Sequence, residues 1–158
     1  MNVAVLGVGN VLMKDDGIGV HVVRRLLDDG LPPNVVAIDS GTSLDAAFSV
    51  DGSARVVVVD AARGGGPPGS VYRVRLSDVR RRHGPLSTCH DIDLLSVLSL
   101  DLSGASPKVT ILGVEPSEIG WGLDLSPDLS KRLPEILDAV REEIQLGGAD
   151  ADHGTQAD

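Results

Sequence analysis

The chain has 158 residues, of which 42% are hydrophobic, and this is enough material for one domain with a sizeable core. Trp, Tyr and Phe occur once each, so aliphatic side chains must fill that core. The formal net charge of −9 argues against nucleic-acid binding, because neutralising phosphates requires clustered Lys and Arg side chains.

The single cysteine and the hydropathy of the chain indicate a cytoplasmic location. Cys89 is the single cysteine, which excludes an internal disulfide. The first residues form no signal-peptide pattern, and no apolar run approaches the roughly 20 residues that span a bilayer. We therefore expect a monomer in the cytoplasm, with neither a membrane nor a nucleic-acid partner.

Short apolar runs alternate with helical patterns from the N-terminus onwards. Residues 3–8 predict a buried strand, and the apolar residues of 17–29 recur at helical spacing. A second strand is expected at 35–38 and a short helix at 44–50. The clearest strand is 56–59, four valines in succession, which are apolar on both faces and therefore predict a central strand that ends at Asp60.

The second half continues the alternation after a loop rich in glycine and proline at 64–69. The remaining expected elements are a strand at about 71–76, a helix at 91–100, a strand at 109–112 and a helix at 128–146. This order predicts a three-layer α/β/α sandwich around a mostly parallel, twisted sheet of about five strands, as in phosphorylase- or hydrolase-like folds. Residues 1–146 would form the domain and the polar residues 147–158 a disordered tail.

Polar side chains follow the predicted strands at their carboxyl ends, where open α/β sheets bind ligands. Asp15 and Asp16 follow the first strand, Asp39 ends the second, and Asp60 ends the central one. His90 opens the helix of the second half. The carboxylates of Asp16 and Asp60 with the imidazole of His90 form an oxygen and nitrogen ligand set suited to Ni, Zn, Mn or Fe.

Each of these residues also has a purely structural interpretation. Asp15 or Asp16 could cap the first helix, and Asp60 could close an Asx turn. His90 could cover the start of its helix, with Thr88 as the cap. No local ligand pair such as H-E-x-x-H is present, so the spacing alone leaves both interpretations open.

A competing motif is the run 7–12, Gly-Val-Gly-Asn-Val-Leu, which begins like a dinucleotide fingerprint. Leu12 replaces the third glycine, and Asp15 and Asp16 would repel a pyrophosphate at the helix N-terminus. The acidic residue expected further on is present as Asp39. A nucleotide-binding module is thus weakened as a hypothesis and not eliminated.

Other reactive groups give weaker patterns. There is no G-x-S-x-G nucleophile elbow, and Cys89 is adjacent to His90, whereas a working Cys–His pair normally meets across the fold. We expect Cys89 to be a small buried residue and His21 to lie on the surface. The arginines at 73, 75 and 80–82 are either a solvated face or a contact for an acidic partner.

Five segments, in this order, resemble the hydrogenase maturation protease family, the nickel-dependent endopeptidases of the NiFe hydrogenases. The resemblance covers roughly residues 3–145. The segments are VLGVGNVLMKDDGIGVHVV, IDSGTS, VVVVDAARGGGPPGSVYRV, STCHDIDLLSVL and VTILGVEPSEIGWGLDLSPDL.

The resemblance implies a site and an activity. The family's metal-binding set falls on Asp16, Asp60 and His90, with Asp where many members have Glu at the first position, and Asp39 matches a further acidic position. The activity would be removal of the C-terminal extension of a hydrogenase large-subunit precursor. The nickel would belong to that precursor's cluster, and no nucleotide would be needed.

The resemblance leaves the attacking group open. A metal-polarised carbonyl, or a water activated by Asp16, Asp39 or Asp60, is compatible with it. A nickel checkpoint that has lost cleavage would share the same ligands.

Overall fold

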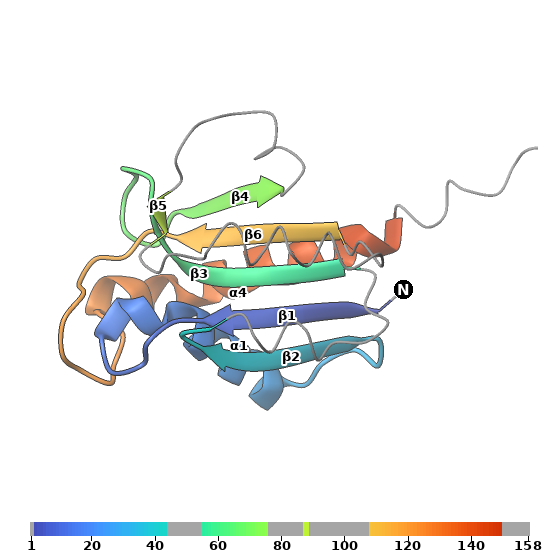
Figure 1. Cartoon of the computed structure of the whole chain (residues 1–158), viewed down its shortest axis with the longest axis horizontal. Helices are drawn as coiled ribbons and strands as arrows, with labels where there is room; N and C mark the ends of the chain where they lie inside the picture. Colours follow the sequence, from blue (N-terminus) through green and yellow to red (C-terminus); the bar gives the residue numbers. More distant parts are fainter. Residues whose placement is uncertain (1, 44–54, 76–86, 89–107, 150–158) are drawn as a thin grey trace, which may run out of the picture.

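The computed structural model describes residues 2–43, 55–75, 87–88 and 108–149 (Figure 1). Its strands are β1 (Val3–Val8), β2 (Val35–Gly41), β3 (Arg55–Arg63), β4 (Val71–Arg75), β5 (Ser87–Thr88) and β6 (Lys108–Val114). Its helices are the 3-10 helix η1 (Lys14–Gly17), α1 (Ile18–Asp29) and α4 (Pro127–Ala149).

The strands form one sheet in the order β2-β1-β3-β6-β4. The first four are parallel, β4 runs antiparallel to β6, and the two-residue β5 pairs antiparallel with the end of β3. The predicted α/β fold with a mostly parallel sheet of about five strands is confirmed. Because β1, β2, β3 and β6 are parallel, their carboxyl ends meet at one edge of the sheet.

Both faces of the central strands are buried, as the valine run predicts. On one face Val5, Val57 and Val59 pack against apolar side chains of α1 and α4, which lie together on that side of the sheet (Figure 1). On the other face Leu6 and Val58 belong to a second buried cluster. The helices expected at 44–50 and 91–100 lie outside the described residues.

Three predicted boundaries are wrong. β3 does not end at Asp60 but continues to Arg63, because its partner β6 also continues, pairing Gly113 with Asp60. β2 extends to Gly41, beyond the predicted end at residue 38. Helix α4 extends to Ala149 and so includes three residues that we expected in the tail. The rest of the predicted tail, residues 150–158, lies outside the described residues.

A buried ionic cluster joins the opposite edge of the sheet to α4. Arg55 donates to the Glu143 carboxylate at 2.6 Å and to its backbone carbonyl at 3.0 Å, while Arg73 donates to both carboxylate oxygens. Burial acts to raise the pKa of Glu143, but the hydrogen bond and charge of Arg73, with help from Thr110 and Arg55, lower it below its ordinary value. Arg73 is therefore used inside the fold, while residues 80–82 lie outside the described part.

In the ranges that the structure describes, no helix is long and apolar enough to cross a membrane.

Candidate active site

The connection from β1 to α1 crosses the carboxyl edge of the sheet at very close range. A Cβ added to Gly19 would lie 2.1 Å from the Val59 carbonyl oxygen and 2.4 Å from that of Val8, so only glycine lets α1 begin directly on β1 and β3. Gly9 has φ +149°, and a Cβ there would lie 2.2 Å from the Asp16 carbonyl oxygen. This close approach fixes the backbone of Asp16 at the end of β1.

Asp16 is buried in η1, with 6% of its surface exposed. Its carboxylate accepts a long hydrogen bond, 3.4 Å, from the Asn10 backbone N–H. Because η1 contacts β3, Asp16 lies beside the strand that carries Asp60.

Asp60 is fully buried within β3. Its Oδ1 accepts from the Ala61 backbone N–H at 2.8 Å, which is the local contact that the Asx interpretation predicts, although the chain continues as a strand. By the alternation of β-strand side chains, Asp60 shares a face with Val58. Asp16 thus lies on the element that follows β1, and Asp60 lies near the end of β3, at the carboxyl edge of the two central strands.

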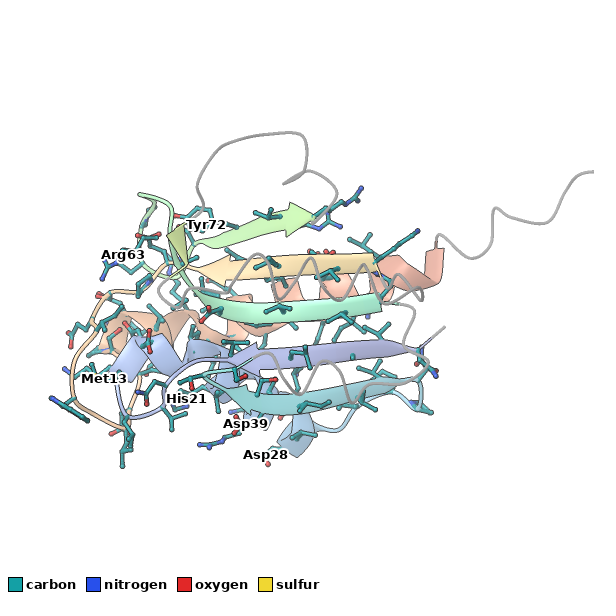
Figure 2. The ribbon with its side chains drawn as sticks, viewed as in Figure 1. Met13, His21, Asp28, Asp39, Arg63 and Tyr72 are labelled. Carbon is teal, nitrogen blue, oxygen red and sulfur yellow. The ribbon has the colours of Figure 1, made fainter. Side chains whose placement is uncertain are left out.

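Asp39 lies on the other face of the sheet. It pairs with Gly7 and follows Ala37, which packs on the α1 side. Its carboxylate accepts from the Gly41 backbone N–H at 3.0 Å and from Arg24 of α1 at 3.3 Å. Figure 2 labels Asp39 at the end of β2. The structure therefore does not bring Asp39 to the same face as Asp60.

Asp15 has a role that the sequence did not indicate. Its fully buried carboxylate accepts from the backbone N–H groups of Ser117, Glu118 and Ser126 at 2.7–2.9 Å, and from the Ser126 hydroxyl at 2.7 Å. Neither η1 nor α1 begins with a side-chain cap bond, so the capping interpretation of the acidic pair is wrong. Asp15 instead anchors the segment between β6 and α4.

His21 is half-buried rather than on the surface, and it lies at this end of the sheet, as does Met13 (Figure 2). Burial lowers the pKa of His21 and so does the charge of Arg24, against the opposing effects of Asp124, Asp15 and a hydrogen bond with the Leu123 backbone. The His21 imidazole is therefore neutral near pH 7.

The loop at 64–69 is fixed at the same edge by a buried carboxylate. Glu115, which follows β6, accepts from the Gly64 backbone N–H at 2.6 Å and from the Tyr72 hydroxyl at 2.9 Å. Tyr72 in turn accepts from the Gly66 backbone N–H at 2.8 Å. These hydrogen bonds join the loop to Tyr72 of β4 and to the residue that follows β6.

The third predicted metal ligand, His90, lies outside the described residues, as does Cys89. Within the ranges that are described, no three His, Cys, Asp or Glu side chains form a metal site. Thr88, two residues before His90 in the sequence, pairs with Ala62, two residues beyond Asp60.

The glycine motif does not form a dinucleotide site of the usual kind. Residues 10–17 separate Gly9 from the start of α1, and two buried carboxylates, Asp15 and Asp16, occupy that connection. A pyrophosphate would have to displace them from the helix N-terminus.

Comparisons with known proteins agree on one family. A sequence profile described as hydrogenase maturation protease matches residues 20–143. Hydrogenase expression/formation protein HupD of Rhodobacter capsulatus is 33% identical over 147 residues, covering 89% of this chain and 70% of that protein. Hydrogenase 2 maturation protease of Escherichia coli is 29% identical over 156 residues, covering 96% and 95%. The solved structure of hydrogenase maturating endopeptidase HybD from E. coli matches with a TM-score of 0.77 at 28% identity, covering 94% of each chain.

Proposed function

This chain belongs to the hydrogenase maturation protease family, and on that premise we propose that it removes the C-terminal extension of a hydrogenase large-subunit precursor after nickel insertion. It would act on that precursor as a monomer in the cytoplasm. The relatives named as maturation proteases and endopeptidases support the reaction, and the carboxylates at the sheet edge supply a place for it.

Recognition of the precursor would depend on its nickel. We assign Asp16, Asp60 and His90 as the groups that complete a coordination sphere left open in the precursor, because carboxylate and imidazole ligands suit nickel. The observation that supports this assignment is the pairing of Thr88, two residues before His90 in the sequence, with Ala62, two residues beyond Asp60. A shared metal would anchor the precursor and position its C-terminal peptide over the edge of the sheet.

Burial supports a cation at this place. An opposite charge stabilises a buried carboxylate, and Asp16 and Asp60 are both buried, on η1 and on the strand β3 that η1 contacts. A nickel ion presented by the precursor would supply the positive charge. The same carboxylates would bind an empty precursor less well, so the protease would act only after metal insertion.

The attacking water would be activated on the nickel side of the sheet. Asp16 and Asp60 would be the candidates for this, because Asp39 faces α1 and accepts a hydrogen bond from Arg24. We therefore assign proton transfer to Asp16 or Asp60, and to Asp39 the positioning of the turn at Gly41.

Mass spectrometry of a nickel-loaded precursor tests the proposal. The wild type should release a C-terminal peptide, and Asp60→Asn and His90→Ala should not. Asp39→Asn is the matched control, a carboxyl-to-amide change on the opposite face, and should keep most of the activity. Trimming by His90→Ala at the wild-type rate would contradict the ligand assignment, and nickel-dependent binding without trimming by the wild type would indicate a checkpoint.

A further inference from the structure

Four large apolar side chains are exposed on two segments, the β1–α1 connection and the segment between β6 and α4. Trp121 is 81% exposed and Leu123 is 65% exposed, and Leu12 and Ile119 are also exposed. Trp121 is the one Trp of the chain. Tryptophan is buried in most folds and is enriched among the residues that dominate binding energy in protein interfaces.

These side chains are displayed on two segments that are paired through their backbones. The Gly122 N–H donates to the Leu12 carbonyl at 2.9 Å, and the Lys14 N–H donates to the Gly122 carbonyl at 2.9 Å. Met13 and Gly122 form a β-bridge. The Asp15 carboxylate anchors the same segment further along. The exposed groups are thus held in place before any partner binds, which lowers the entropic cost of binding.

This surface lies on the connection that carries Asp16 of the proposed nickel site. Leu12 is four residues before Asp16 on the β1–α1 connection, and the Gly122 N–H, between Trp121 and Leu123, donates to the Leu12 carbonyl. Asp16 and Asp60 are buried and offer little contact area, whereas a specific protein complex requires about 800 Å² from each partner. The area must come from surfaces around the site, and the exposed side chains of Leu12, Trp121 and Leu123 offer an apolar surface of this kind.

We propose that this docking surface, formed by Leu12, Ile119, Trp121 and Leu123, binds the folded body of the hydrogenase large-subunit precursor. The inference rests on the proposed function. The rim carries Lys14, which is paired with Glu118, and the acidic Asp124. The complementary surface on the precursor would therefore be an apolar patch bordered by Lys or Arg side chains.

Steady-state trimming kinetics test the surface separately from the reaction. Trp121→Ser and Leu123→Ser should raise KM for the nickel-loaded precursor at least about tenfold and leave kcat within a factor of about two, because they remove binding area and no reacting group. Leu27→Ser is the matched control, since Leu27 is 51% exposed toward the far end of α1. An unchanged KM for Trp121→Ser in a series where the wild type trims normally would overturn the inference.

A binding measurement distinguishes this failure from failure of the proposed function. Incorporating 5-fluorotryptophan labels Trp121 alone, and its fluorine resonance should shift or broaden when unlabelled precursor is added. Perturbation without trimming would refute the protease proposal and uphold the docking surface, whereas trimming without perturbation would do the opposite. Broadening that depends on the concentration of this chain alone would mean that a second copy covers the surface, and would also overturn the inference.

Discussion

Replacing Asp15 by Asn should lower the stability of the fold, because the Asp15 carboxylate, unlike that of Asp16, anchors the segment between β6 and α4. Its Oδ2 accepts from the Ser117 and Glu118 backbone N–H groups and from the Ser126 hydroxyl, and its Oδ1 accepts from the Ser126 N–H. An amide can offer only one oxygen. When that oxygen faces the three donors, the amide NH2 group faces the Ser126 N–H. Both groups are donors, so the hydrogen bond from the Ser126 N–H is lost.

The magnitude follows from this arrangement. Ser126 is 2% exposed, so its N–H would remain buried without an acceptor, at a cost of about 1–3 kcal/mol. The other three hydrogen bonds would change from charge-assisted to neutral and lose roughly half of their strength. The smaller desolvation cost of a neutral amide offsets part of this loss. We expect the free energy of unfolding to fall by about 3 kcal/mol, a large share of the about 5–15 kcal/mol typical of a domain.

Urea unfolding of a double-mutant cycle measures the effect. Ser126→Ala removes one donor to Asp15 and also the hydroxyl that accepts from the Leu129 N–H near the start of α4, at a cost of about 1–2 kcal/mol. Because both changes affect one network, the double variant should be more stable than the sum of the two losses predicts by at least about 1 kcal/mol. Strict additivity, or a loss below about 1 kcal/mol for Asp15→Asn, would refute the reasoning.

Three further outcomes are expected. Because the pKa of Glu143 is lowered in the fold, its stabilising contribution should be complete above its ordinary value of 4.5 and decline as the pH falls below it, and Glu143→Gln should flatten that part of a stability-versus-pH curve. Gly19→Ala should lower stability by more than about 2 kcal/mol in urea unfolding, despite the better helix propensity of alanine, whereas Gly120→Ala, with no atom within 4 Å of the new Cβ, should have little effect. Tyr72→Phe should cost about 1–2 kcal/mol and speed amide hydrogen exchange at Gly66, and unchanged exchange would contradict the hydrogen bond.

The regular elements were largely predictable because their signals are local. The valine run at 56–59 is apolar on both faces, and the structure buries it between two clusters. The end of β3 was not predictable from Asp60, since a strand ends where its neighbours stop pairing, and β6 continues beside it to Val114.

The sequence by itself also determined that carboxylates follow the parallel strands and would gather at one edge. It placed Asp16 in the ligand set but gave its neighbour Asp15, which has the same chemistry, no role beyond a possible helix cap. Only the tertiary structure gave Asp15 its donors, because Ser126 is 111 positions away in sequence and the bond has no local pattern.

The same limit applies to which face or surface a side chain occupies. Asp39 was predicted to end its strand, but it lies two residues before the end of β2, and the pairing of β2 with β1 turns it toward Arg24 and away from Asp60. As a tryptophan, Trp121 would be assigned to the core from its residue type alone. In the structure its side chain is exposed, on a segment that the β-bridge between Met13 and Gly122 joins to the β1–α1 connection. The order of apolar and charged residues along the chain predicts helices and strands. Contacts between segments that are distant in sequence determine what each side chain faces.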